Sequence, residues 1–206
     1  MRITTLLGTF LLLGSVAGQA QQAPRVVRPF LSLAFTTGGD TLASATYTDG
    51  SSSSIKAGGE TLFKGGLDFQ VAPRFSLQAS YGIHTDSTKE AKNGSMDFKR
   101  NAVEGLGFWH PSEHVRLGLG FRKTSDARVS GSGVAASDTI HFNSSTGTIF
   151  QFEYLTGPLT SFGSRGGLSL RYVNEKYTPS SVDNVGPVTG PSVDGSHFGV
   201  GFAWYF

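Results

Sequence analysis

The chain has 206 residues, with 17 Lys and Arg against 15 Asp and Glu, 28 Gly and no Cys. A charge balance this even leaves no basic surface of the kind that binds nucleic acid, so nucleic acid is excluded as a partner. Without cysteine the chain can form neither a disulfide nor a lipid-modified cysteine, and its length suits a single domain.

The first 20 residues have the three parts of a secretory signal peptide. Arg2 supplies a positive charge, 6–17 is mostly apolar, and 18–20 offers a cleavage site. The apolar stretch is shorter than the about 20 residues that a membrane helix needs, which argues against a retained anchor helix. We expect cleavage after Ala20, with Ala17 as the alternative, followed by a polar periplasmic leader over 21–29.

From residue 30 onward, large apolar residues alternate with small or polar ones, which predicts β-strands that each have one apolar face. Phe75, Leu77 and Tyr81, for example, share one face of a strand. No apolar stripe with helical spacing follows residue 30. Eight stretches are predicted as strands: 31–36, 60–71, 75–84, 98–109, 115–122, 140–155, 168–172 and 198–206.

Long and short connections alternate between these strands. Short turns are predicted near 72–74, 110–113 and 157–158, and long polar loops over 38–59, 85–97, 124–139 and 178–195. An even number of strands places both ends of the sheet on one side, with short turns in the periplasm and long loops outside the cell.

The fourth predicted strand is the least regular. Val103 and Trp109 lie on the face opposite Glu104, but Leu106 and Phe108 share the face of Glu104. Either a β-bulge interrupts this strand, or the two apolar side chains pack inside the sheet.

The apolar face continues through all eight strands, while the other face mixes Gly, Ser, Gln and charges. A soluble sandwich would coat its outer face with charge, but charged residues make up only 16% of this chain. Because lipid satisfies no backbone hydrogen bond, a lipid-facing sheet must close on itself. We therefore predict an all-β fold, an eight-stranded antiparallel up-and-down transmembrane β-barrel over 30–206, ahead of a secreted β-sandwich. Aromatic residues near strand ends should form two girdles, with Phe75, Trp109, Tyr154, Trp204 and Phe206 towards the short turns and Tyr81, Phe121, Tyr172 and Phe198 towards the long loops.

In architecture, 30–206 resembles the small eight-stranded outer-membrane barrels of the OmpA, OmpX and opacity-protein type. The specific part of the resemblance is a C-terminal assembly signal at Gly201, Trp204 and Phe206, although Gly199 stands where that signal often has a polar residue. The resemblance implies an outer-membrane location, a monomer, contact with outer-membrane lipid and lipopolysaccharide, and recognition by the barrel-assembly machinery. Deleting Phe206 is then expected to reduce insertion into the membrane.

Seven charged residues fall on the inward face. Counting residues upward from the short turns places Arg116 and Glu153 low on neighbouring strands. It places Asp68, Glu104 and Arg171 near mid-height, and Lys64 and Arg122 higher. Matched heights of opposite charge predict ion pairs that fill the lumen, because buried charges must be paired. The pairs could simply hold the barrel closed, or they could gate a small water or ion path. The set is Lys64, Asp68, Glu104, Arg116, Arg122, Glu153 and Arg171, and we expect Arg116 to be coupled to Glu153.

Some outer-membrane barrels of this size are lipid A acylhydrolases or acyltransferases, so the resemblance also allows an enzymatic role. A catalytic base must lie about 3 Å from its nucleophile, and Glu153 is a strand-length away from the sequence around His141. His110 and His114 have a metal-like spacing but flank Pro111 in a turn. We predict no enzyme, no cofactor and no metal. The alternative catalytic set is His84, His141 and His197 with Ser144, Ser145 and Glu153.

The long loops, rich in Ser, Thr and Gly, are the remaining place for function, because binding sites commonly sit on exposed loops. We predict a membrane-structural or surface-interaction role, with an extracellular ligand held by the loops. The first alternative is a small channel for ions or for small, even hydrophobic, solutes, for which the inward Leu106 and Phe108 are the only hint. The lipid A acylhydrolase is the second alternative.

Overall fold

The computed structural model describes residues 27–46, 50, 52–88, 94–133, 138–158 and 164–206. Fifteen β-strands make up this part of the chain, which contains no helix. Accordingly, no helix among these residues is long and apolar enough to cross a membrane. The predicted signal peptide over 1–20 and most of the leader over 21–29 lie outside the described residues, so their boundaries stay predictions.

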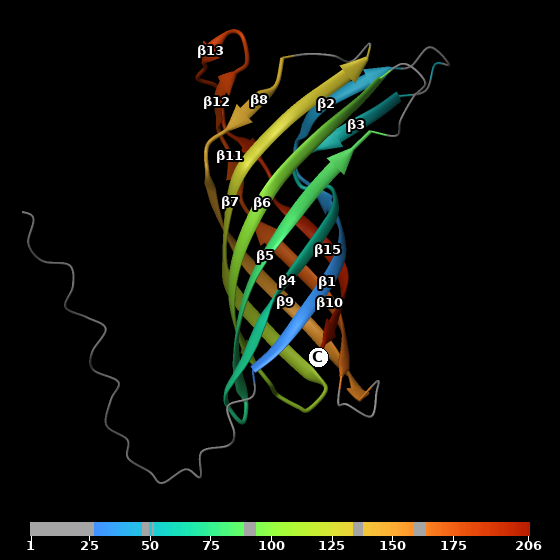
Figure 1. Cartoon of the computed structure of the whole chain (residues 1–206), viewed down its shortest axis with the longest axis vertical. Coiled ribbons are helices and arrows are strands. Elements are labelled where there is room, and N and C mark those ends of the chain that lie inside the picture. Colours follow the sequence, from blue (N-terminus) through green and yellow to red (C-terminus); the bar gives the residue numbers. More distant parts are fainter. Residues whose placement is uncertain (1–26, 47–49, 51, 89–93, 134–137, 159–163) are drawn as a thin grey trace, which may run out of the picture.

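Eight long strands form a closed antiparallel barrel, which confirms the predicted fold (Figure 1). Each strand pairs with the next along the chain, and the first pairs with the last, where Leu33 lies opposite Phe202. Closure leaves no free edge in the wall, as lipid requires. The strands are β1 (Val27–Gly38), β4 (Glu60–Ala72), β5 (Phe75–Ser87), β6 (Gly94–Trp109), β7 (Val115–Gly133), β9 (Ser145–Pro158), β10 (Arg165–Asn174) and β15 (His197–Tyr205).

The barrel wall exposes its apolar face and buries its polar one. Phe121 and Phe198 are 67% and 66% exposed, whereas the inward Arg122 is 1% exposed. Exposing such an outer surface to water would be energetically unfavourable, whereas a surface of this kind matches the apolar band of a transmembrane barrel. The residues predicted for both aromatic girdles, Phe75, Trp109 and Phe206 among them, also lie on the outside.

The long connections contain more strand than the sequence predicts. Their Ser, Gly and Thr content is typical of loops, but β6 and β7 stay paired beyond the apolar band, as far as Gly94 and Gly133. Among the described residues, seven shorter strands lie at the same end, some paired to β7 and its neighbours and others paired only with each other. Together with the upper ends of β5 to β7 they form what we call the cap. These strands are β2 (Thr41–Thr46), β3 (Ser52–Lys56), β8 (Ile140–Phe142), β11 (Lys176–Tyr177), β12 (Pro179–Val182), β13 (Gly186–Pro187) and β14 (Val193–Asp194).

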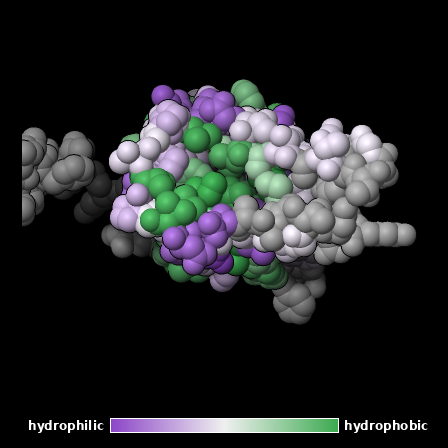
Figure 2. Space-filling model, turned by 90° about the horizontal axis from the view of Figure 1, so that it is seen from above, coloured by the Kyte–Doolittle hydropathy of each residue, from purple (hydrophilic) through white to green (hydrophobic). Residues whose placement is uncertain are grey.

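The cap has a hydrophobic core of its own, separate from the lipid-facing surface of the barrel. Phe98 packs edge-on against Phe142 and Tyr177, with ring centroids 5.7 and 5.6 Å apart. Seen from the cap end, apolar side chains gather towards the middle of this face and hydrophilic ones lie around them (Figure 2). The buried members of this core are Ile55, Ala57, Phe98, Ala127, Val129, Phe142 and Tyr177.

A β-bulge makes the cap core possible. The register between β6 and β7 shifts between Lys99 and Asn101, which leaves one extra residue on β7 near Asp126, whose φ is 53°. An extra residue reverses the side to which later side chains point. Ala127 and Val129 therefore face inward and join the core.

The uncertainty in the fourth predicted strand is settled in favour of interior packing. Leu106 and Phe108 are 2% and 1% exposed and lie in the lumen. The register of β6 is unbroken from Asn101 to Trp109, so no bulge is needed there.

Candidate functional site

The lumen holds two groups of buried charges, and the group nearer the cap, which we call the upper group, centres on Glu104. One Glu104 oxygen accepts from Lys64 Nζ at 2.8 Å, and the other accepts from Arg171 Nη2 at 2.7 Å. Arg122 Nη1 lies 3.6 Å from Glu104, and Arg122 Nε lies 3.4 Å from Glu175. All five side chains are buried, so the charges neutralise one another with little help from water.

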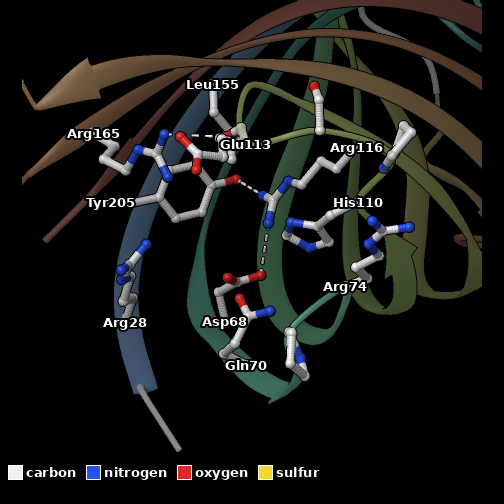
Figure 3. Close-up of a pocket in the computed structure, with 13 residues that line it drawn as sticks. Arg28, Asp68, Gln70, Arg74, His110, Glu113, Arg116, Leu155, Arg165 and Tyr205 are labelled. Carbon is white, nitrogen blue, oxygen red and sulfur yellow. Dashed lines mark hydrogen bonds and ion pairs between the residues drawn. The ribbon is translucent and has the colours of Figure 1, made fainter. Parts of the chain in front are cut away.

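The lower group lies near the short turns and centres on Arg116 (Figure 3). Arg116 Nη1 donates to Asp68 at 2.9 Å, and Nη2 donates to Glu153 at 3.1 Å. The Tyr205 hydroxyl donates to Glu153 at 2.7 Å and accepts a hydrogen bond from Arg116. One guanidinium group thus joins strands β4, β7 and β9, and Tyr205 adds β15.

All seven predicted lumen residues belong to these two groups. Their heights in the barrel differ from those obtained by counting residues from the turns. Asp68 belongs with Arg116 rather than with Glu104, while Lys64 and Arg122 reach the level of Glu104. The reason is strand tilt, because a hydrogen-bonded row climbs as it passes round a barrel. One row of register partners starts near the short turns and ends near the cap: Arg116, Glu153, Ser169, Gly201, Ala34, Leu62, His84 and Arg100.

The Arg116–Glu153 contact exists as the sequence predicts, but its energetic coupling stays a prediction. Apolar side chains occupy the lumen beside both groups. Leu106, Phe108, Ile149 and Val173 form one cluster, and the Arg116 guanidinium carbon lies 4.1 Å from the centre of the Phe108 ring. Charged and apolar side chains together line the described lumen, and a barrel of eight strands leaves room for little else.

Four further residues belong to the lumen network although the sequence did not predict them there, and all four are buried: Arg100, Glu175, His84 and His197. Arg100 and Arg122 approach His84 Nδ1 at 2.8 and 3.0 Å. Because guanidinium groups only donate, Nδ1 accepts, and His84 Nε2 lies 2.8 Å from Thr36 Oγ1. Continuing the inward alternation past each predicted strand end would have found Glu175 and His197, and Arg100 shares the face of Glu104.

Above the barrel, Glu175 also connects the lumen to the cap. The Tyr177 hydroxyl donates to Glu175 at 2.5 Å, and Thr124 Oγ1 donates to it at 2.9 Å. Burial raises the pKa of Tyr177, with the nearby Glu175 carboxylate acting in the same direction, so this hydroxyl keeps its proton. The ring of Tyr177 is at the same time part of the cap core.

The residues of the enzymatic alternative have separate partners. His141 lies in the cap with Nε2 3.1 Å from Asp183, Ser145 donates to the Lys176 carbonyl at 2.6 Å, and Glu153 belongs to the lower group. Among the described residues, no group of three or more His, Cys, Asp or Glu side chains could hold a metal. His110 bonds Ser76 at 2.9 Å, whereas the ring of His114 lies against Tyr154.

The predicted assembly residues lie at the seam between β1 and β15. The Phe206 N–H donates to the Pro29 carbonyl at 3.0 Å, and Trp204 and Phe206 point outward with their rings stacked. Gly201 points inward, where a Cβ would lie 2.9 Å from the Cβ of Ala34. Gly201 therefore has a packing role in the wall, and recognition of these residues by the assembly machinery stays a prediction.

No protein-family model matches the chain, and no curated protein matches it. Among solved structures, Ail, the attachment invasion locus protein of Yersinia pestis, in complex with the heparin analogue sucrose octasulfate, is 14% identical with a TM-score of 0.46, and the match covers 87% of this chain and 97% of that one. The outer membrane protein AlkL in lipid bilayers is 15% identical with a TM-score of 0.45, covering 87% and 90%. Neisserial surface protein A is 10% identical with a TM-score of 0.43, covering 87% and 97%.

The location of the protein follows from its own structure. A closed barrel whose outer face is apolar along the whole wall is stable only in a membrane, and eight antiparallel strands with short turns at one end are typical of the outer membrane. The chain is an integral outer-membrane β-barrel.

Proposed function

We propose that the protein is a surface-interaction barrel, in which the filled barrel is a scaffold and the cap binds a partner outside the cell. The observation that carries this proposal is the cap itself. Strands β6 and β7 continue past the apolar band, and β8, β12 and β13 widen them into a sheet. A sheet supported by its own core presents a fixed surface, which lowers the entropic cost of binding.

The outer face of this sheet carries a row of basic residues. Lys99 on β6 lies directly opposite Arg128 on β7, and Arg128 lies opposite His141 on β8. Like charges directly opposite each other destabilise an antiparallel pair. Among the described residues, no carboxylate oxygen lies within 4.0 Å of Lys99 or Arg128. An anionic group on the partner would relieve this repulsion.

The proposal is tested by the binding of dextran sulfate, with unsulfated dextran as the neutral probe, to the protein in phosphatidylcholine nanodiscs. We expect selective binding of the sulfated polymer and a weakening of about tenfold or more in Lys99→Gln/Arg128→Gln, which corresponds to about 1.4 kcal/mol or more of binding free energy. Lys176→Gln is the matched control, because it removes another exposed cap lysine. Equal binding by the double variant would contradict the proposal.

Each of the two alternative functions, the small channel and the acylhydrolase, can be tested by a separate measurement. A filled lumen should show no steady conductance in a planar bilayer, and clear conductance by correctly folded protein would favour the small channel. Release of fatty acid from lipopolysaccharide that disappears in His141→Ala would instead establish the acylhydrolase.

A further inference from the structure

A second feature lies at the opposite end of the barrel from the cap. A cavity of about 500 Å³ opens at the mouth formed by the short turns (Figure 3). Arg28 reaches it from β1, Arg74 from the turn after β4, and Arg165 from the start of β10. Arg116 and Tyr205 of the lower group line it from inside the lumen. The cavity is therefore bounded by strand ends and by the turns over 73–74 and 110–113.

Positive charge dominates this cavity. Four guanidinium groups line it, against the two carboxylates of Asp68 and Glu113. Arg116 is already paired with Asp68 at 2.9 Å and with Glu153 at 3.1 Å, so the positive excess comes from the three arginines at the rim. Among the described residues, no carboxylate oxygen comes within 4.0 Å of Arg28, Arg74 or Arg165. The three rim arginines thus line one space without an ion pair to a described carboxylate.

The arginines of the cavity differ in how they are held. Arg165 is fixed by bonds from Nε to the Thr156 carbonyl and from Nη2 to the Glu113 carbonyl, both 3.1 Å long. The guanidinium groups of Arg28 and Arg74 make no hydrogen bond to described residues. Arg116 is 1% exposed, and its Nε has no hydrogen-bond partner in the described part of the chain. Arg28 and Arg74 are therefore the cavity arginines whose guanidinium groups are available to a ligand.

We propose that this cavity binds a small multivalent anion that carries phosphate groups. Guanidinium groups bind phosphate oxygens in pairs and keep their charge at every physiological pH, and three of them surround a space of small-molecule size. The phosphate could belong to a soluble phosphate ester or to the headgroup of a lipid at the rim of the barrel. The proposal does not depend on any partner of the cap.

The probe is pyrophosphate, titrated calorimetrically into the whole protein in dodecyl maltoside micelles, which carry no phosphate. We expect saturable binding that Arg28→Gln/Arg74→Gln weakens at least tenfold and that Lys176→Gln, at the cap end, leaves unchanged. Arg165 is kept because it holds the neighbouring turns. Absence of saturable binding by protein that shows the heat-dependent gel migration of a folded barrel would overturn the proposal, and so would equal affinity in the double variant.

A second arm separates the two sources of phosphate. If nanodiscs of zwitterionic phosphatidylcholine weaken pyrophosphate binding relative to the phosphate-free micelles, a lipid headgroup occupies the cavity, and unchanged affinity indicates a soluble anion. His110 gives an independent signal, because burial and the charge of Arg116 lower its pKa. A bound anion should raise the pKa of His110, seen by NMR of its ring protons, in wild type but not in the double variant. Sodium chloride at matched ionic strength serves as control, and an equal rise there would overturn specific binding.

Discussion

The upper and lower groups of the lumen are built in opposite ways. In the upper group one carboxylate, Glu104, is shared by the cations of Lys64, Arg122 and Arg171. The lower group has the reverse arrangement, in which one guanidinium, Arg116, is shared by two carboxylates. Each group therefore depends on a single central charge, and the loss of that charge would leave like charges facing each other at short range.

The surroundings of the two groups also differ. The upper group is enclosed, because Arg122 contacts Glu175 and Glu175 accepts the Tyr177 hydroxyl of the cap. The lower group borders the open cavity at the short-turn mouth, where water can reach it. Water weakens charge repulsion, so the same loss should cost more stability in the upper group than in the lower one.

Removal of Glu104 should have the largest effect. Glu104→Gln keeps the shape of the side chain but leaves three cations without their common partner. We expect a loss of about 3–5 kcal/mol in the free energy of unfolding. Urea unfolding in lipid vesicles, followed by the fluorescence of Trp109 and Trp204, measures this loss. Glu113→Gln, at an exposed turn, should change the same quantity by less than about 0.5 kcal/mol. Equal stability of Glu104→Gln and wild type would show that the upper cations are neutralised by other means.

Removal of Arg116 should have the second largest effect. Arg116→Met leaves Asp68 and Glu153 without a cation, but water from the short-turn mouth relieves part of the repulsion. We expect a loss of about 2–4 kcal/mol, measured by the same urea unfolding. A loss greater than that of Glu104→Gln would contradict the role given to the open mouth.

The hypothesis that Arg116 and Glu153 are coupled is tested by a double-mutant cycle. Glu153→Gln in the Arg116→Met background removes one of the two facing carboxylates, so the double variant should be more stable than the sum of the single effects predicts. An interaction energy near zero would rule out the coupling, although the two side chains lie 3.1 Å apart.

The wall of the barrel could be predicted from the sequence because alternation is a local property. Leu119 and Phe121 are separated by one residue and must share a face whatever the rest of the chain does. The composition of the charged groups could not be predicted as easily, because strand tilt decides which rows meet. Asp68 bonds Arg116 because the strands are tilted, and this tilt is a property of the closed barrel rather than of the sequence of one strand.

The cap shows a second limit of prediction from local pattern. Its strands are short and rich in Ser, Gly and Thr, so their sequence is typical of loops. β8, β12 and β13 are strands because they extend the sheet from the free edge of β7, whereas β2 pairs with β3 and β11 pairs with β14. The bulge near Asp126 also reverses the alternation within one strand. Glu175 was missed because the predicted seventh strand ended at residue 172, before the inward pattern did.

Tyr205→Phe should have the smallest effect. It distinguishes the contribution of the Tyr205 hydroxyl to the lower group from that of the Arg116 guanidinium. The substitution removes the hydroxyl that donates to Glu153 at 2.7 Å, but the ring keeps its contact with Phe30, whose centroid is 5.5 Å away. We expect a loss of about 1–2 kcal/mol, because a buried carboxylate loses one donor but keeps its guanidinium partner. Tyr154→Phe is the matched control, since that outward ring is 45% exposed near the same mouth and should show almost no change. If Tyr205→Phe were as costly as Arg116→Met, the hydroxyl rather than the guanidinium would be the centre of the lower group, and the two groups would no longer be opposites.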